Sequence, residues 1–482
     1  MISTVTKSIY INGEWQDIDS SKTQVVYNPA TLEPITEVAF GGQTETKEAI
    51  DAASKAFPVW SEMTGRQRSR ILYKAAELMR KDAKRLGEIL TVEQGKPLKE
   101  AIGEVKGAAG FLLWYAEEAS RGYGEWIPSS MKEKRMLVIP KPIGVVAAIT
   151  PWNFPSSMIT RKLGPALAAG CTTVLKPSPE TPLSAIEIVK IFEEAGMPPG
   201  VINLVTGDAQ AIGKEMLTNK GVKLITFTGS TAVGKYLMRE AADQVKKVSL
   251  ELGGHAPIIA FSDADIDKAT SLSLASKFRN NGQTCICANR LYVHESIADG
   301  FTAMLKEKVE KLKVGLGLEE DTDLGPLISE QAREKVQAHL DDALEKGAEL
   351  VTGGNKWAGE LQGYFCPPTI IKNATDDMKV MREETFGPLF PIQTFSDEEE
   401  VIKKANDTDY GLAAYIFTEN TSRTLRVAER LEYGIIGVND VFPSVPEAPF
   451  GGIKQSGNAK EGGHYGMDEF LEKKFVSIGI DS

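Results

Sequence analysis

The spacing of apolar residues along the chain changes near residue 145. Between residues 46 and 120, apolar side chains recur every three or four positions, as in TKEAIDAASKAFPVW and RSRILYKAAELMRKDAKRLGEILTVEQG. Residues three and four apart lie on one face of an α-helix, so this spacing is typical of helices with one buried face. The stretch is therefore predicted to be helical.

Beyond residue 145, short apolar runs alternate with helical stretches. The runs are VVAAIT, CTTVLKP, VINLVTG, VKLITFTG and KKVSLELGG. The helical stretches begin near Pro155, Thr181, Asp208 and Thr231. Five strands alternating with four helices predict a parallel sheet covered by helices. Because open parallel sheets bind ligands at the carboxyl ends of their strands, we expect the functional site there.

A second alternation begins after residue 254. APIIAF precedes a helix expected from about Asp265, and ANRLYVHES follows as another strand. Further helices are predicted near 296–313 and 329–346, with strands near 349–352 and 388–394, which makes a second α/β domain. KRMLVIPKPI and the terminal KKFVSIGI fit neither alternation. An unpaired terminal strand exposes its edge, and a partner subunit could cover it.

Length, charge and composition narrow the class of protein. A chain of 482 residues is too long for one core, and two or three domains are expected. The net charge of −11 argues against a nucleic-acid surface. No apolar run approaches the roughly 20 residues that cross a bilayer, and MISTVTKSIYINGEW lacks a signal-peptide core. Four scattered cysteines do not suit a secreted disulfide scaffold. We therefore expect a cytoplasmic enzyme with neither a nucleic-acid nor a membrane partner.

The stretch TFTGSTAVGKY reads as a strand, a glycine turn and the start of a helix. Gly229 and Gly234–Lys235 match the P-loop pattern, but Tyr236 stands where a P-loop needs Ser or Thr to hold magnesium, which disfavours an NTPase. One alternative is an ordinary helix entry capped by Ser230 or the threonine after it. The other is a diphosphate bound by the N–H groups of the helix N-terminus.

Three further turns carry polar residues at strand ends. Lys176 in VLKPSPETP would face the ligand crevice, although a surface lysine is equally compatible. Trp152 and Asn153 in ITPWNFP lie in a proline-flanked turn, either as corner residues or as a ligand wall with an amide donor. Glu251 in LELGGHAP is either solvated or, if buried, a base whose pKa is raised.

The stretch FRNNGQTCICANR contains two cysteines separated by one residue. C-x-C supplies only two metal ligands, and no nearby histidine completes a zinc site. None of the four histidines lies in a recognisable protease motif. Cys287 is expected to be a small buried residue. Cys285 follows the polar GQT in what reads as a flexible turn, where an accessible thiol can ionise, so a nucleophile is favoured.

Taken together, the motifs ELGGHAP, NGQTC, TPWNFP, FTGSTAVG and EETFGP resemble the NAD(P)-dependent aldehyde dehydrogenase superfamily over essentially the whole chain. TPWNFPSSMITRK, SKFRNNGQTCICANR and APFGGIKQSG look most like its succinate-semialdehyde dehydrogenase branch. The resemblance implies an α/β fold with three parts. These are a Rossmann-type cofactor domain (1–120 and 142–252), an α/β catalytic domain (253–451) and a β oligomerisation arm (121–141 and 452–482). A homo-oligomer, dimer or tetramer, is expected.

The resemblance also implies a mechanism. Cys285 would attack the aldehyde to give a thiohemiacetal, whose oxyanion is held by the Asn153 side chain and the Cys285 N–H. Hydride would pass to NAD or NADP and leave a thioester. Glu251 would then activate water to hydrolyse that thioester. No metal is expected.

The superfamily's cofactor contacts carry over to a set of residues on several turns. They are Ile149, Thr150, Trp152, Lys176, Ser178, Pro179, Gly229, Ser230, Leu252, Glu384 and Phe386. NAD-preferring relatives place an acid where this chain has Pro179. With no carboxylate expected there to repel a 2′-phosphate, NADP should be tolerated or preferred.

The branch resemblance further implies a site for a substrate carboxylate. Arg161 in TRK and Arg279 in KFRN are its predicted anchors, and Ser444 in FPSVPEAPF is a less secure third contact. The expected substrate is succinate semialdehyde, with glutarate semialdehyde or another aliphatic aldehyde as the alternative. Cys287 is a redox candidate, because peroxide could join it to Cys285.

Overall fold

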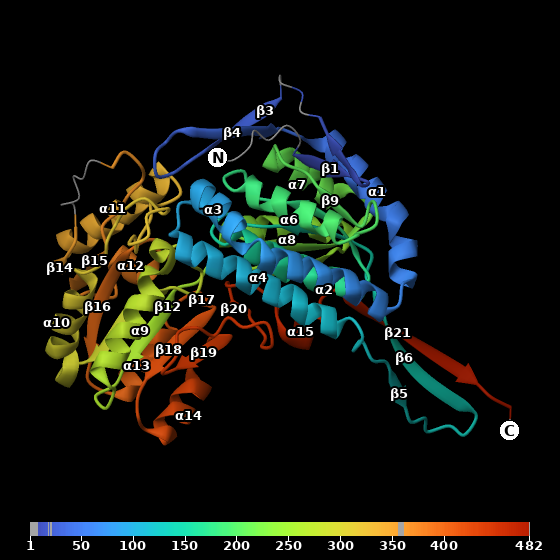
Figure 1. Ribbon diagram of the computed structural model, residues 1–482. Coiled ribbons are helices and arrows are strands. Elements are labelled where there is room, and N and C mark those ends of the chain that lie inside the picture. Colours follow the sequence, from blue (N-terminus) through green and yellow to red (C-terminus); the bar gives the residue numbers. More distant parts are fainter. Residues whose placement is uncertain (1–7, 18, 20–21, 355–360, 482) are drawn as a thin grey trace.

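Two seven-stranded sheets with helices on their faces form the framework of the protein (Figure 1). The structure is a computed structural model, and it describes residues 8–17, 19, 22–354 and 361–481. The first sheet has the order β11-β10-β7-β8-β9-β1-β2. Its five predicted strands are parallel, namely β7 (Val145–Ile149), β8 (Thr172–Lys176), β9 (Ile202–Leu204), β10 (Val222–Thr228) and β11 (Lys247–Glu251). The predicted alternation is confirmed for this sheet.

Two short strands and eight helices complete this half of the chain. β1 (Ile9–Ile11) and β2 (Glu14–Gln16) add an antiparallel edge. The predicted helices between strands are α5 (Pro155–Ala169), α6 (Pro182–Glu194), α7 (Ala209–Thr218) and α8 (Thr231–Ala241). The helical stretch before them forms α1 (Gln43–Glu62), α2 (Gly65–Lys81), α3 (Ala83–Gln94) and α4 (Leu98–Glu118). β8 is buried along its whole length, as expected for a parallel strand covered on both faces.

Helix α5 matters most for the site, because it starts directly after the TPWNF turn. Pro155 occupies the first helical position, where a missing N–H costs no hydrogen bond. Gly170 ends the helix with φ 101°, a left-handed conformation that suits glycine. The residues between are buried except Ser157, so α5 is a fixed support for the turn that precedes it.

The second sheet has the order β14-β15-β16-β13-β12-β18-β19. Its strands are β12 (Ala256–Ala260), β13 (Ala288–His294), β14 (Glu349–Thr352), β15 (Thr369–Lys372), β16 (Leu389–Phe395), β18 (Ala413–Phe417) and β19 (Ile435–Val438). β14 pairs antiparallel and the others pair parallel. The helices of this half are α9 (Ile266–Phe278), α10 (Ala298–Val309), α11 (Glu330–Glu345), α12 (Lys379–Arg382), α13 (Glu398–Asn406), α14 (Thr421–Arg430) and α15 (Gly463–Asp468). The elements predicted up to residue 352 and near 388–394 are confirmed, whereas β15, β18, β19, α13 and α14 were not predicted.

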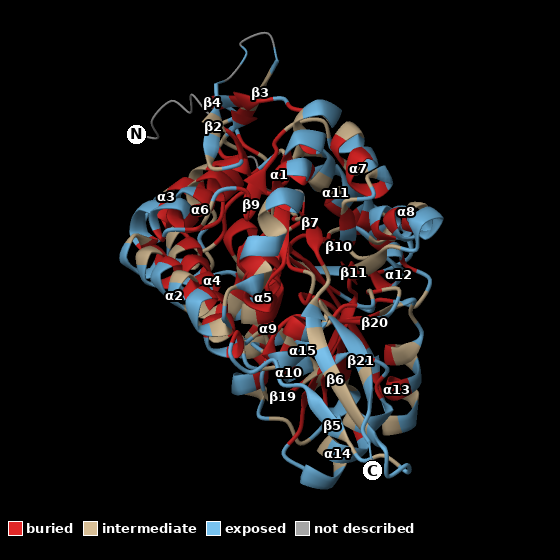
Figure 2. Ribbon diagram, turned by 90° about the vertical axis from the view of Figure 1, so that its right-hand side faces the viewer, coloured by how far each residue is buried: buried red, intermediate tan, exposed pale blue. Residues whose placement is uncertain are grey.

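A three-stranded arm projects from the two sheets (Figure 1). It consists of β5 (Glu125–Ile127), β6 (Lys134–Pro142) and β21 (Leu471–Gly479). β21 pairs antiparallel with β6 from Leu471 opposite Pro142 to Gly479 opposite Lys134. The terminal strand is therefore not unpaired, and the expectation of an unpaired strand is wrong. Figure 2 shows that the arm is mainly exposed or half-buried, in contrast to the buried strands of the first sheet.

Two short ladders and some one-turn helices remain. β3 (Thr23–Tyr27) pairs with β4 (Pro34–Ala39), and β17 (Tyr410–Gly411) pairs with β20 (Ile453–Lys454). The one-turn helices are η1 (Ala242–Gln244), η2 (Arg279–Gly282) and η3 (Glu295–Ile297). Within the described ranges, every helix is too short or too polar to cross a membrane.

Candidate active site

Four neighbouring strands of the first sheet end at one edge, and the predicted cofactor residues lie there. β11, β10, β7 and β8 are adjacent and parallel, so their carboxyl ends share that edge. Ile149 and Lys176 are the last residues of β7 and β8, and Thr150 donates its backbone N–H to the Lys176 carbonyl at 3.1 Å. Gly229 and Leu252 directly follow β10 and β11. The sequence thus places these residues correctly along the sheet.

The N-terminus of α8 is packed tightly onto the end of β11. Ser230 caps the helix, and its hydroxyl accepts a hydrogen bond from Val233 N at 3.4 Å. A Cβ on Gly234 would lie 2.3 Å from Leu252 Cδ2, so a larger residue would require the Leu252 side chain to move. Gly234, which gave the P-loop likeness, thus lies against the Leu252 side chain.

Two buried hydroxyls at the same edge support the fit of a dinucleotide. Thr150 Oγ1 and Thr228 Oγ1 have no hydrogen-bond partner within the part of the chain that the structure describes. Buried hydroxyls normally have a partner. Together with the N–H groups of the α8 N-terminus, they provide donors for phosphate and ribose oxygens.

Trp152 and Phe386 bring the two halves of the chain together beside this edge. Their rings meet edge to face, with centroids 5.6 Å apart and an interplanar angle of 88°. Phe386 has φ 57°, which is uncommon for a bulky residue and marks a constrained turn. Two residues earlier, Glu384 Oε1 accepts a hydrogen bond from Gly254 N at 2.9 Å, and burial raises the pKa of Glu384 to about 7.

The loop after β8 differs from the expectation in one respect. Lys176 is buried and its Nζ donates to the Pro177 carbonyl at 3.1 Å. Burial lowers the pKa of Lys176, whereas the charge of Glu180 raises it. The Ser178 hydroxyl donates a hydrogen bond to the Glu180 carboxylate. Pro179 itself carries no acid, but the sequence analysis did not consider Glu180, whose side chain the turn brings back to Ser178.

The segment that delivers Cys285 is rigid. Asn280, Asn281 and Gly282 have left-handed backbones, with φ of 49°, 55° and 76°, and all three are buried. Asparagine and glycine tolerate that conformation best. Asn281 Nδ2 donates to the Gly325 carbonyl at 2.9 Å and holds the turn in place. The predicted flexible polar turn is therefore wrong, since the turn is buried and the amide nitrogens of Asn280 and Asn281 donate hydrogen bonds to backbone carbonyls, although their Oδ1 atoms have no partner among the described residues.

The protonation state of Cys285 also differs from the expectation. Its side chain is half-buried, and burial raises the pKa of the thiol to about 12, with the nearby charge of Glu251 as the next cause. The charge of Arg161 acts in the opposite direction. In this arrangement the thiol is protonated at neutral pH, so the expectation of a readily ionised thiol is wrong.

Cys287 is buried, as expected. Its Sγ lies 3.5 Å from the Lys277 carbonyl oxygen, and burial raises the pKa of its thiol. Both cysteines are free. The redox role of Cys287 remains a prediction.

Asn153 lies against the segment that carries the cysteine. Its side-chain Nδ2 donates a hydrogen bond to the Gln283 carbonyl at 3.0 Å, two residues before Cys285. A Cβ on Gly254 would lie 2.3 Å from the Cys285 carbonyl oxygen, so the turn after β11 packs on the same segment. The structure thus brings together the amide, the thiol and the end of β11.

Glu251 is the last residue of β11, and its carboxyl group is buried. Neither carboxyl oxygen has a hydrogen-bond partner among the described residues. Burial raises the pKa of Glu251 well above its ordinary value, and the charge of Glu461 raises it further. Glu461 itself pairs with Lys162, Nζ to Oε1 at 2.7 Å. Lys162 and Glu461 were not predicted from the sequence, because they are 299 positions apart and no motif links them.

The two predicted carboxylate anchors have different surroundings. The Arg161 guanidinium lies buried between the rings of Phe111 and Phe450, 4.8 and 4.0 Å from their centroids. Its Nε is 3.3 Å from Glu461 Oε2, an ion-pair distance without hydrogen-bond geometry. Arg161 Nε and Nη2 thus have no hydrogen-bond partner within the described ranges, and both can still donate.

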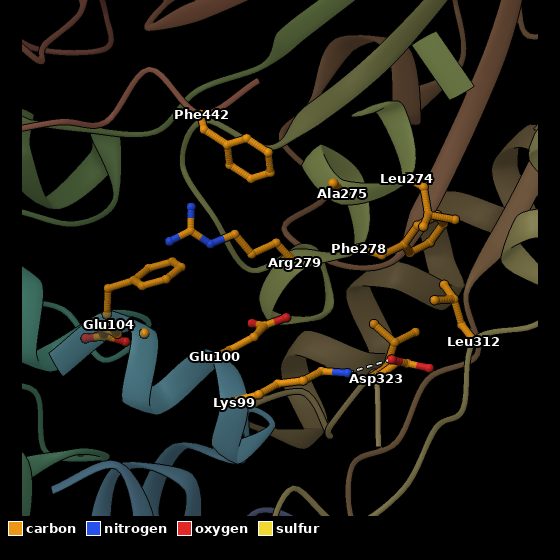
Figure 3. A pocket seen from close by; sticks show the side chains of 13 residues that line it. Lys99, Glu100, Glu104, Leu274, Ala275, Phe278, Arg279, Leu312, Asp323 and Phe442 are labelled. Carbon is orange, nitrogen blue, oxygen red and sulfur yellow. Dashed lines mark hydrogen bonds and ion pairs between the residues drawn. The ribbon is translucent and has the colours of Figure 1, made fainter. Parts of the chain in front are cut away.

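Arg279 faces a pocket of about 380 Å³. Figure 3 shows its side chain extending into the pocket between Phe442 and Glu100. Its guanidinium lies 4.9 Å from the centroid of the Phe154 ring. Phe154 directly follows Asn153 in the sequence. Ser444 is half-buried, two residues after Phe442 on the same loop.

Comparisons with known proteins agree with the sequence motifs. The sequence model of the aldehyde dehydrogenase family matches residues 15–476. The chain is 52% identical over 471 residues to glutarate-semialdehyde dehydrogenase from Pseudomonas putida, covering 98% of this chain and 97% of that protein. It is also 52% identical over 470 residues to succinate-semialdehyde dehydrogenase (NADP+) from Escherichia coli, with the same coverage.

A solved structure gives the same result for the fold. The crystal structure of succinate-semialdehyde dehydrogenase from Burkholderia pseudomallei superimposes with a TM-score of 0.97 at 49% identity, covering 100% of this chain and 99% of that one. The family and fold predicted from the motifs are confirmed. The chain belongs to the aldehyde dehydrogenase family.

Proposed function

We propose that this enzyme oxidises a short semialdehyde with a terminal carboxylate, using NADP or NAD. Succinate semialdehyde is the preferred candidate, and glutarate semialdehyde is the alternative. The observation that carries the proposal is Arg161, a buried guanidinium beside the candidate nucleophile Cys285. Two of its nitrogens have no hydrogen-bond partner among the described residues, although Nε lies at an ion-pair distance from Glu461. A buried cation with free donors is costly, and a substrate carboxylate would satisfy it. Relatives named for both substrates, at the same 52% identity, leave the chain length to experiment.

The reaction begins with a bond between the Cys285 sulfur and the aldehyde carbon. The thiol is protonated at rest, because burial raises its pKa, and it loses its proton to water as this bond forms. The carbonyl oxygen becomes an oxyanion, and the Asn153 amide and the Cys285 backbone N–H donate hydrogen bonds to it. A bound nicotinamide supplies the acceptor for the hydride that leaves this carbon.

The second half of the reaction hydrolyses the resulting thioester. Glu251 accepts a proton from water as the water attacks the acyl carbon, and the acid is released from Cys285. The burial of Glu251 makes it a stronger base than an exposed carboxylate, provided that it is first deprotonated. The loss of that proton therefore precedes hydrolysis.

We assign cofactor binding to residues at the strand ends described above. Trp152 and Phe386 form one wall, while Gly229 and Ser230 begin the helix that faces the diphosphate. We assign Lys176 to binding the adenine ribose. Ser178 and Pro179 lie beside it on the same loop.

The carboxylate beside Pro179 predicts how the cofactor preference can be changed. Glu180→Gln keeps an acceptor for Ser178 and removes a negative charge that opposes a 2′-phosphate. We expect the ratio of kcat/KM for NADP to that for NAD to rise by about tenfold. Pro179→Glu adds a carboxylate and should shift the ratio toward NAD. Initial rates at 340 nm with both cofactors measure the ratio, and an unchanged ratio in both variants would show that this loop does not read the ribose.

The substrate assignment predicts a selective loss in the arginine variants. Arg161→Ala and Arg279→Ala should each lower kcat/KM for succinate semialdehyde by roughly 30- to 1000-fold, because one charge-assisted contact is lost. Butanal, which has no carboxylate, should lose far less, and its loss in Arg161→Ala should reflect only the effect of the Arg161 charge on the Cys285 thiol. Both aldehydes are compared by the rate of NADPH formation. Equal losses for the two aldehydes would mean that the arginines support the fold, and the substrate assignment would fall.

We further propose that the chain divides into the cofactor domain, the catalytic domain and the oligomerisation arm that the family resemblance implies. We also propose that the arm contacts a second copy of the chain. The arm carries large exposed apolar side chains, among them Trp126 (64% exposed) and Phe475 (57% exposed). Its outer strand β21 also has a free edge in the described structure. Both features favour an oligomer. Light scattering that gives the molar mass of a single chain at working concentration would contradict this.

A further inference from the structure

A buried lysine lies directly under the turn that carries Asn153. Lys96 follows Gly95, which ends α3 with φ 97°, and precedes Pro97, so its backbone is held on both sides. Its ammonium lies 2.6 Å from Glu104 Oε2, 2.7 Å from the Asn153 carbonyl oxygen and 3.8 Å from the centroid of the Phe154 ring. The Lys96 and Glu104 side chains are 0% and 1% exposed. Fully buried charges are rare in proteins and need partners of this kind.

Glu104 connects this lysine to the helix that follows the turn. One carboxylate oxygen pairs with Lys96, and the other accepts hydrogen bonds from Ser156 N at 2.9 Å and Ser157 N at 3.2 Å. These N–H groups belong to the first turn of α5, where no carbonyl within the helix can accept them. A carboxylate there also interacts favourably with the helix dipole. Lys96 thus holds the turn that carries Asn153, and Glu104 holds both Lys96 and the start of α5.

Asn153 is held at two points. Its carbonyl accepts hydrogen bonds from Lys96 Nζ and from Asn280 Nδ2 at 3.0 Å. Its side-chain amide donates one hydrogen to the Gln283 carbonyl. An amide NH2 has two hydrogens, so the second one is directed by the first bond and by the fixed backbone. Without the Lys96 bond, the peptide group after Asn153 could rotate and take the amide with it.

We infer that Lys96, held by Glu104, positions the Asn153 amide for the oxyanion. Lys96 acts through the Asn153 carbonyl and does not touch the reacting atoms, so it is a positioning residue. The inference rests on the proposed function, in which Asn153 is an oxyanion donor. The simpler alternative is that the ion pair only stabilises α4 against α5. The two explanations differ in whether the loss of Lys96 matters once the Asn153 side chain is gone.

The primary test is Lys96→Met, which keeps the length of the side chain and removes its charge. Rapid mixing with succinate semialdehyde and NADP measures the first turnover by NADPH absorbance. We expect this rate to fall by about 100-fold, since a small misplacement of a catalytic group has that effect. Alkylation of Cys285 by iodoacetamide serves as the control, because this reaction forms no oxyanion. Its rate should change by less than about threefold. A parallel loss in both rates would indicate general damage to the site and overturn the inference.

A double-mutant cycle makes the test specific to Asn153. In an Asn153→Ala background, Lys96→Met should lower the first-turnover rate by less than about threefold more, because the group it positions is absent. The same loss in both backgrounds would overturn the inference. If Asn153→Ala alone leaves the rate unchanged, the oxyanion role in the proposed function fails instead. The two failures are therefore distinguishable.

Two further variants show whether the effect of Lys96→Met comes from a loss of folding. Arg68→Met removes another buried cation, whose Nε donates to the Ala168 carbonyl at 3.1 Å near the far end of α5. It should lower the thermal unfolding temperature and leave the first-turnover rate unchanged. Glu104→Gln keeps the side-chain volume and weakens the hold on Lys96. It should slow the first turnover in the same way, again only when Asn153 is present. If Glu104→Gln is inert while Lys96→Met fails to fold, the inference is overturned.

Discussion

Replacing Cys285 by alanine is expected to abolish aldehyde oxidation, with a loss of about 10^5-fold or more in kcat. No sulfur would remain to form the thiohemiacetal, and the rest of the site cannot substitute for a covalent bond. NADPH formation at 340 nm measures this loss, while tryptophan fluorescence on addition of NADP checks that the variant still binds the cofactor.

Cys287→Ala is the matched control for this prediction. It removes the neighbouring thiol, which is buried and faces the Lys277 carbonyl. Most of the activity should remain. Equal losses in the two variants would contradict the assignment of Cys285 as the nucleophile.

Replacing Glu251 by glutamine is expected to separate the two halves of the reaction. The amide keeps the volume of the carboxyl group and removes the base, so thioester formation continues while hydrolysis slows by roughly 10²- to 10⁴-fold. Stopped-flow absorbance should show a burst of NADPH followed by a very slow steady rate. Wild-type turnover in this variant would mean that another group activates the water.

The raised pKa of Glu251 adds a pH dependence to this prediction. Because the pKa of Glu251 is raised, its basic form appears at a higher pH than that of an exposed carboxyl group and increases as the pH rises. The hydrolysis rate of the wild-type enzyme should therefore rise with pH through a range above the one in which an exposed carboxyl group titrates. Glu251→Gln should lose this rise, because its amide does not titrate.

The five parallel strands of the first sheet were predictable because each reads as an apolar run followed by a turn, whereas their order in the sheet was not predicted. The residues placed at those ends, from Thr150 to Leu252, lie where the pattern predicts. In contrast, β21 pairs with β6 across more than 300 positions, and no local pattern indicates such a partner. The strands β18 and β19 were also missed, although β18 is an apolar run buried along its whole length. β19 is only four residues long and contains a glycine, so its pattern is weak.

The charged residues around the site were the hardest to predict. Lys96 and Lys162 are polar positions in helical or turn sequences, where a lysine is usually exposed. Only the fold shows that they are buried and pair with Glu104 and Glu461. The same holds for Glu180, since the turn that returns it to Ser178 is not visible in the sequence. The assignment of Cys285 as the candidate nucleophile, by contrast, rests on its motif, which does not indicate that burial raises the pKa of the thiol.

The central claim, that Cys285 carries the acyl group of a carboxylated semialdehyde, can be tested by trapping that group. Glu251→Gln would be mixed with succinate semialdehyde and NADP, quenched in acid during the burst and digested for mass spectrometry. We predict one succinyl group on the peptide that contains Cys285, in an amount equal to the NADPH formed. A burst of NADPH with the acyl group on another residue, or with no covalent acyl group, would contradict the account.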